Sequence, residues 1–222
     1  MPDISTVNGI DITTLSSFGG VAFADGQTLD GQNVALVSEA HTFISSQTAS
    51  SDSSLSFTSG IDSTYDVYEW HFINMHPASD DVNFTFQFNA SGGSGFNETI
   101  TSTGFEAYLR EDDGNSALTY RSTIDQAQGT SYQPATRTTS NDSDSSASGI
   151  LTLYAPSSTT YVKHFVVTAH DMQHQAAYPA YARQTRVAGY INTTSAIDEI
   201  DFKFDSGNID AGEIRMYGVA TS

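Results

Sequence analysis

Val82-Asn83-Phe84-Thr85-Phe86-Gln87-Phe88 is the stretch of sequence that decides the fold. Every second residue in it is apolar, and the residues between are polar. An alternation with a period of two places one face of a β-strand on a core and the other face toward solvent. The stretch therefore predicts a half-buried strand over residues 82–88.

The same alternation recurs on both sides of this stretch. It is strong in Tyr68–Ile73, Phe165–Ala169, Ile200–Phe204 and Ile214–Val219, and weaker in Phe105–Arg110, Leu118–Arg121, Ile150–Tyr154 and Arg186–Ile191. Gly, Asn, Asp and Ser fill the connections, which favours antiparallel pairing over a parallel sheet with helical crossovers. We therefore expect an all-β fold of about nine strands, an antiparallel β-sandwich of jelly-roll type.

Two segments of the expected sandwich lack this pattern. Gln126–Ser148 is a long run rich in Ser, Thr, Asn and Asp, and we expect it to form a contact loop at the rim. His174–Arg183 contains Pro179, so a short helix and a loop are both open there.

The N-terminal part differs from the rest in composition and contains a short repeat. Ser5–Ile12 matches Ser16–Phe23 at an offset of 11 residues, and each copy places a Gly-containing turn between apolar residues. That chemistry is typical of a tight hairpin. Ser45–Ser54 is a polar stretch that predicts a linker. We expect residues 1–54 to form an extended N-terminal arm and linker and residues 55–222 to form the sandwich; a disordered leader is the alternative for the arm.

Charge and composition exclude several classes of function. The chain has 26 Asp plus Glu against 8 Lys plus Arg, a net charge of −18, which argues against nucleic acid and anionic membranes as partners. It has no cysteine, so disulfides and thiolate metal sites are excluded. Neither a signal-peptide pattern nor an apolar run of about 18 residues is present. Such a chain suits a particle in a salty medium, or is simply an acidic soluble protein.

Candidates for metal binding are weak in this sequence. His170 and His174 are spaced for a metal site on a helix, but the first falls at a strand end and the second in a loop. Glu111-Asp112-Asp113 precedes Gly114 and Asn115, so this run is either a cation-binding turn or a charged hairpin turn. We predict no metal site and no cofactor.

Catalytic patterns are equally weak. No serine lies in a Gly-x-Ser-x-Gly elbow, and no carboxylate partner for Asp66 or Glu69 can be chosen. We therefore predict no catalytic residue and a chain that is not an enzyme.

Tyrosines offer the clearest candidates for contact with a ligand. Trp70 alternates with core residues, so we expect it in the core, whereas Tyr178-Pro179-Ala180-Tyr181 falls outside the pattern. Tyrosine rings suit both sugar faces and protein interfaces. Tyr178 and Tyr181 are therefore our candidates for contact with a host glycan or a partner.

Three segments carry a resemblance to a known group of proteins. Two of them resemble segments of structural proteins of marine tailed bacteriophages: Phe57–Tyr68, continuing to Phe72–Asp80, and the C-terminal run Phe204–Gly218. The Val7-Asn8-Gly9-Ile10 unit is similar to short repeats in phage tail and virion proteins. The match covers the arm and the two ends of the sandwich, and the middle is unmatched. The resemblance implies a virion component without catalytic residues, and it leaves capsid against tail open.

The sequence therefore predicts a phage virion structural protein, either a capsid decoration protein or a tail-associated one. We expect it to bind a major capsid or tail protein through apolar arm residues, to display the sandwich outward, and to form a homo-oligomer, with a trimer suggested by analogy with viral jelly rolls. The predicted partner-binding residues of the arm are Val7, Ile10, Ile12, Phe18, Val21 and Phe23. The alternatives are a carbohydrate-binding module that recognises a host receptor and, third, a glycan-active enzyme.

Overall fold

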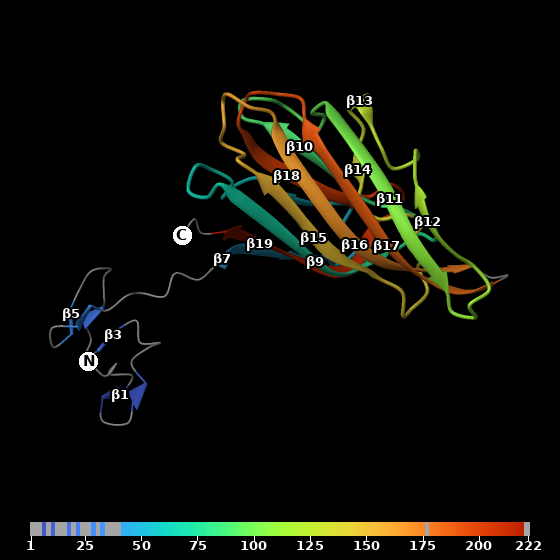
Figure 1. Cartoon of the computed structure of the whole chain (residues 1–222), viewed down its shortest axis with the longest axis horizontal. Helices are drawn as coiled ribbons and strands as arrows, with labels where there is room; N and C mark the ends of the chain where they lie inside the picture. The colour runs from blue at the N-terminus through green and yellow to red at the C-terminus, as the bar shows by residue number, and fades with distance from the viewer. Residues whose placement is uncertain are drawn as a thin grey trace. The chain divides into compact units, whose positions relative to one another are not determined.

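The computed structural model of the 222-residue chain describes residues 41–175 and 178–219, together with six two-residue strands in the first 40 residues (Figure 1). Side chains are described for residues 41–174 and 179–219. The chain divides into two units, residues 1–40 with Ser222 and residues 41–221. The described ranges contain strands and no helix, and so no helix that is long and apolar enough to cross a membrane.

Two antiparallel sheets form the second unit. The larger has nine strands in the order β12-β11-β17-β16-β15-β9-β19-β7, with β13 paired to β11. Its strands are β7 (His41–Thr48), β9 (Val67–Pro77), β11 (Ile100–Arg110), β12 (Ser116–Tyr120), β13 (Ala127–Gly129), β15 (Ala147–Tyr154), β16 (Lys163–Gln175), β17 (Tyr178–Ile191) and β19 (Ile209–Val219). The smaller sheet has the order β14-β10-β18-β8, formed by β8 (Leu55–Phe57), β10 (Phe84–Ala90), β14 (Gln133–Pro134) and β18 (Ile197–Phe204).

Aromatic rings fill the space between the two sheets. Phe84 and Phe86 on β10 face the larger sheet, with ring centroids 5.2 Å from Phe72 and 5.4 Å from Phe165. Trp70 is fully buried against Phe202 on β18, at 6.5 Å. Figure 1 shows β10 and β18 lying behind the strands of the larger sheet. The antiparallel β-sandwich is confirmed, and so is the core position of Trp70.

The sandwich begins earlier in the chain than the sequence suggested. β7 pairs with β19 from His41↔Val219 to Thr48↔Glu213, so the second unit starts at His41 and not at Leu55. The expected linker is therefore partly a strand, because Ser45 to Thr48 hold their place through backbone hydrogen bonds that need no apolar side chain. The predicted boundary at residue 54 is corrected accordingly.

Two other predictions are corrected within the sandwich. Gln126–Ser148 is not one unbroken loop: it contributes β13 and β14 and packs against β10, where Gln87 donates to the carbonyls of Thr130 and Ser131. Its role as a contact surface stays a prediction. His174–Arg183 is neither a short helix nor a loop, because β16 extends to Gln175 and β17 begins at Tyr178. In both segments the side chains lack the apolar alternation from which strands were predicted, and backbone pairing forms the strands nevertheless.

Three hairpins repeat in the first unit. β1 (Thr6–Val7) pairs with β2 (Ile10–Asp11), β3 (Ser17–Phe18) with β4 (Val21–Ala22), and β5 (Thr28–Leu29) with β6 (Gln32–Asn33). The closing pairs are Val7↔Ile10, Phe18↔Val21 and Leu29↔Gln32. The sequence between them is Asn-Gly, Gly-Gly and Asp-Gly, the dipeptides that two-residue hairpin turns favour. The predicted repeat therefore has a third copy at the same offset.

The predicted partner-binding residues of the arm belong to these hairpins. Ile12 and Phe23 lie outside the described residues, and of Val7, Ile10, Phe18 and Val21 only the backbone is described. Their part in binding a neighbouring subunit stays a prediction.

Candidate functional site

The polar end of the larger sheet is the candidate site. On β16 the inward series Phe165, Val167 and Ala169 continues as Asp171 and Gln173, both buried. The strand register places Asp171 opposite Arg183 on β17, and Arg183 opposite Tyr108 on β11. Charged side chains therefore occupy positions that are apolar further along the same strands.

Glu106 on β11 is the centre of an ionic cluster. Its side chain is fully buried, and its Oε1 accepts a hydrogen bond from Nε of Arg121 at 2.7 Å and one from Nη1 of Arg137 at 3.4 Å. Arg121 also approaches this oxygen through Nη2, at 2.5 Å. The side chains of Arg121 and Arg137 are about 30% exposed, so their guanidinium groups reach from the buried carboxylate to the surface.

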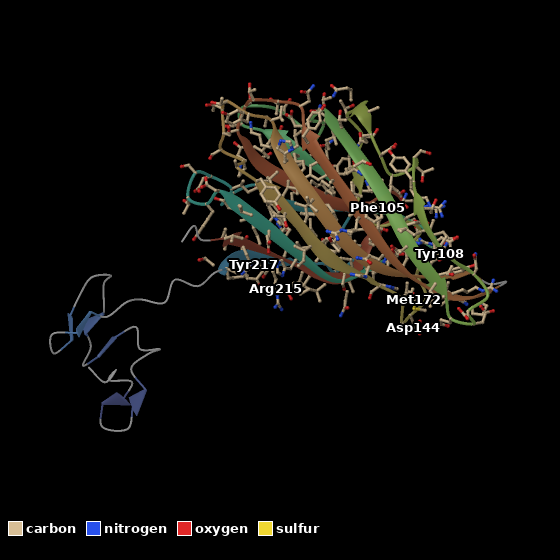
Figure 2. The ribbon with its side chains drawn as sticks, in the orientation of Figure 1. Phe105, Tyr108, Asp144, Met172, Arg215 and Tyr217 are labelled. Carbon is tan, nitrogen blue, oxygen red and sulfur yellow. The ribbon has the colours of Figure 1, made fainter. Side chains whose placement is uncertain are left out.

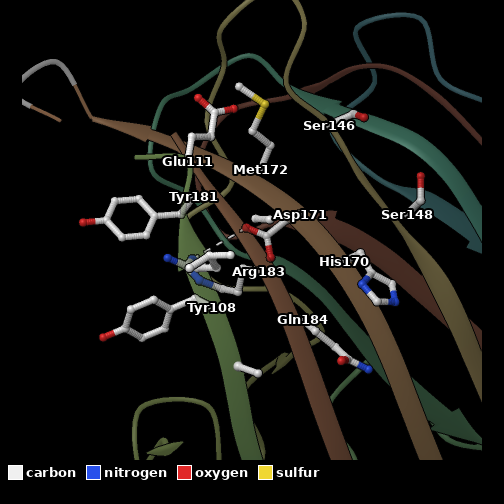
Figure 3. Close-up of a pocket in the computed structure, with 13 residues that line it drawn as sticks. Tyr108, Glu111, Ser146, Ser148, His170, Asp171, Met172, Tyr181, Arg183 and Gln184 are labelled. Atoms are coloured by element: carbon white, nitrogen blue, oxygen red, sulfur yellow. Dashed lines mark ion pairs between the residues drawn. The ribbon is translucent and has the colours of Figure 1, made fainter. Parts of the chain in front are cut away.

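Arg183 joins this cluster to a second carboxylate. Its Nε lies 3.7 Å from Oε2 of Glu106, and its Nη1 lies 3.6 Å from Oδ2 of Asp171, as the dashed line in Figure 3 marks for the second pair. Arg183 also donates to the carbonyl of Arg137 and to Oε1 of Gln173. Oε2 of Glu106, Nε of Arg183 and both carboxylate oxygens of Asp171 are buried without a hydrogen-bond partner in the described part of the chain. Such atoms are uncommon in folded proteins and call for an explanation.

Burial decides the protonation of Asp171. Loss of solvent raises the pKa of Asp171 to about 7, although the charge on Arg183 acts in the opposite direction, and Glu106 raises the pKa further. Burial also lowers the pKa of Arg183. Three arginines thus face Glu106 and a carboxyl that is only partly ionised at neutral pH, so the cluster carries a surplus of positive charge.

We expect Asp171→Asn to change how stability depends on pH. An unfolded aspartate loses its proton near pH 4, whereas folded Asp171 keeps its proton up to about pH 7. The folded state binds the extra proton between these values, so the wild type loses stability as pH rises from about 4 to about 7. The variant lacks this loss, so its stability relative to the wild type should rise from pH 5 to pH 8.

Urea unfolding followed at both pH values checks this expectation. Asp144→Asn, at an exposed position, is the matched control and should leave the pH profile unchanged (Asp144 is labelled in Figure 2). A variant that is destabilised by the same amount at pH 5 and pH 8 would show that Asp171 stays ionised and paired throughout.

Two tyrosines form the aromatic part of the site. The rings of Tyr108 and Tyr181 meet edge to face with centroids 5.8 Å apart, and Figure 3 shows both side chains extending to the same side of the sheet. Both line an open groove of about 630 Å³ that crosses β11, β16 and β17. His170, Met172, Gln184 and Ser148 also line the groove (Figure 3). The groove offers ring faces and hydrogen-bonding groups together, as sugar-binding and peptide-binding surfaces do.

A smaller cavity adjoins the groove. It has a volume of about 140 Å³ and is lined by the groove's Tyr108, Tyr181 and Arg183 together with Glu106, Asn115, Arg121, Arg137 and Gln173. The tyrosine pair and Arg183 therefore border both spaces. Arg121 and Arg137 line the adjoining cavity, so a ligand in the groove could reach them by extending a group past the tyrosine pair.

Of the two tyrosines predicted from the sequence, the structure describes the side chain of one. Tyr181 lies at the site, opposite Arg110 on β11 and Gln173 on β16. The side chain of Tyr178 is outside the described residues.

The histidines and the acidic run named from the sequence lie elsewhere. His170 and His174 occupy the outward positions of β16, and His174 pairs with Asp142. No group of three or more His, Asp or Glu side chains is arranged around a metal position among the described residues. Glu111–Asn115 is the turn between β11 and β12, in which Oδ1 of Asp112 accepts from the backbone N–H of Gly114 and from Nε of Arg110. Of the two alternatives for this run, the structure shows the charged hairpin turn.

Sequence reasoning missed Glu106, Asp171 and Arg183, the buried charges of the site. The signal that could have found them is phase: Asp171 lies two residues after Ala169 and four after Val167, on the same face of one strand. A charged residue in the buried phase of a strand is rare unless it is paired. His170, which the spacing argument singled out, is in the opposite phase.

No protein-family model, curated protein or solved structure matches the chain. Proposals about its function therefore rest on its own residues and geometry.

Proposed function

We propose that this chain is a structural protein of phage particles that binds a capsid or tail lattice through its N-terminal repeats and carries the sandwich as its displayed part. The observation that carries the proposal is the division of the chain at residue 40. Before it stand three hairpins at an offset of 11 residues, and after it stands a sandwich with its own aromatic core. Repeated short units of this kind suit attachment to a repeated surface.

An exposed apolar strip on the sandwich supports a binding role. Phe105 and Tyr120 face each other across β11 and β12, next to the pair of Ala107 and Leu118, and Leu109 follows on β11. Leu118 is 73% exposed and Tyr120 57%. Contiguous apolar surface at the edge of a sheet is typical of protein contacts. This strip would lie against a neighbouring subunit of the particle.

Detecting the chain in purified particles tests the proposal. Particles of the phage that carries its gene would be separated by density gradient, and their proteins identified by mass spectrometry. We expect the chain to travel with the particles at a fixed ratio to the major capsid protein. A chain that stays in the soluble fraction of the lysate would contradict the structural role.

The second candidate function is recognition of a host glycan by the sandwich. The observation that favours it is the Tyr108–Tyr181 pair at the edge of the 630 Å³ groove. Replacing Tyr181 with alanine should weaken binding to a glycan array by about fivefold or more, taking the roughly 1–3 kcal/mol that stacking of a base on one aromatic ring contributes as the scale. The exposed Tyr161→Ala is the matched control. If the wild-type chain binds no glycan on the array, the second candidate is dismissed.

A further inference from the structure

Arg121, Arg137 and Arg183 concentrate positive charge in a chain whose net charge is −18. These three of the 8 basic residues line one cavity of about 140 Å³. All three contact Glu106, Arg183 also lies 3.6 Å from Asp171, and the charge on Arg137 acts on Asp171 as well. The local surplus of positive charge is therefore opposite in sign to the charge of the chain as a whole.

The guanidinium groups of this cavity have hydrogen-bond donors that the described residues do not fully occupy. The guanidinium group of Arg137 contacts Oε1 of Glu106 through Nη1 at 3.4 Å, and the side chain of Arg137 is 30% exposed. Oε1 of Glu106 is shared by Arg121 and Arg137, so each of these arginines contacts the same oxygen. Planar guanidinium groups bind carboxylates best when two N–H groups meet two oxygens. The arrangement leaves donors of Arg121 and Arg137 for a second carboxylate.

A buried polar atom beside the cavity also supports the binding of an anionic group. Nε of Arg183, which lines the cavity, is buried and has no hydrogen-bond partner among the described residues. The amide side chains of Asn115 and Gln173 complete the polar lining. The tyrosine pair separates this polar lining from the open groove. A ligand that fits both spaces has a ring for the tyrosines and an anionic group for the arginines.

We propose that the cavity binds the carboxylate of an acidic sugar residue whose ring packs against Tyr108 and Tyr181. This inference rests on the glycan-binding function, and it names the chemical class of the ligand: a glycan that contains uronic or sialic acid. A single carboxylate suits the volume of the cavity, and the sugar ring suits the edge-to-face tyrosines.

An array of glycans in matched pairs tests the inference. Each pair presents one acidic glycan as the free acid and as its methyl ester, so that the two differ only in the negative charge and one added methyl group, and neutral glycans are included. We expect the full-length chain to bind at least one free acid about tenfold or more tightly than its ester. This preference should weaken as salt is raised, because it is electrostatic.

Arg137→Gln separates charge recognition from folding. The side chain of Arg137 is 30% exposed and its Nη1 contacts Glu106 at 3.4 Å, so its loss should disturb the buried cluster little while reducing the preference for the free acid to about twofold or less. Arg215→Gln is the matched control: Arg215 lies on β19, which four strands separate from β11 in the sheet order, and pairs with Glu213 on the surface (Figure 2). The control should keep the full preference.

The possible results separate the inference from the function on which it rests. Equal binding of free acid and ester overturns the inference and leaves glycan recognition standing. Binding of no glycan overturns both. A full preference for the free acid that survives in Arg137→Gln would place the anion site elsewhere and also overturn the inference, whatever Arg215→Gln does.

Discussion

Replacing Phe202 with alanine is expected to lower the free energy of unfolding by about 3–5 kcal/mol, as other Phe-to-Ala changes in cores do. Phe202 is fully buried between the sheets. Its ring lies 5.9 Å from Phe84 in a stacked arrangement and 6.2 Å from Phe57 edge to face. Losing the ring opens a cavity that both sheets line, and rigid strands can close it only in part.

Urea unfolding followed by tryptophan fluorescence measures this effect. The chain has one tryptophan, Trp70, which is fully buried 6.5 Å from Phe202, so its emission reports the integrity of the core directly. Phe105→Ala is the control, because Phe105 is 45% exposed on β11, and it should cost about 1 kcal/mol or less. Equal losses in the two variants would mean that the sheets do not pack through Phe202.

The second large effect is expected from Glu106→Gln. The substitution keeps the shape of the side chain and removes the charge that Arg121, Arg137 and Arg183 face. Breaking a buried ion pair by neutralising one member typically costs about 3–5 kcal/mol, because the remaining charge stays buried without compensation. Here that charge is Arg183, whose side chain is 3% exposed. The free energy of unfolding at pH 7 should fall by an amount in this range.

Asp112→Asn is the matched control for Glu106→Gln. Asp112 lies in the turn after β11 and also pairs with an arginine, Arg110 at the end of that strand, but the side chain of Asp112 is 44% exposed. Its unfolding curve should superimpose on that of the wild type, because water replaces an exposed partner. A Glu106→Gln variant as stable as the control would show that the arginines are solvated in the folded state.

Alternation of apolar and polar residues predicted the strands of the core, but the expected solvent-facing side is wrong for β10, where Thr85 and Gln87 are buried as well. β10 and β18 carry phenylalanines at every second position, and β9 places Tyr68, Trp70 and Phe72 on one face. These segments obey the pattern because one face of each packs against the opposite sheet. Their burial alone is enough to fix the strand and its orientation.

Strand ends and edges could not be predicted from the same pattern. β16 and β17 are 13 and 14 residues long, and the apolar alternation covers only part of each because Asp171, Gln173 and Arg183 take inward positions. β7 was missed because its serines hold it to β19 through the backbone. The third hairpin repeat was missed because Gln32 stands where the earlier copies have Ile10 and Val21.

The candidate site was predicted only through Tyr181. Its other parts come from segments far apart in sequence: Glu106, Arg183 and Asp171 meet because β11 and β16 both pair with β17. No local pattern carries that information, since it depends on strand order. The charged residues in the buried phase were visible in the sequence, but they have meaning only once the partners are known.

Removing residues 1–40 tests the central claim of this account most directly. The shortened chain, residues 41–222, keeps every strand of both sheets. It should unfold at the same urea concentration as the full chain, and it should fail to sediment with particles that were assembled without this protein, whereas the full chain sediments with them. A shortened chain that still sediments with the particles, or that unfolds at clearly lower urea, would contradict a self-sufficient sandwich attached through its N-terminal hairpins.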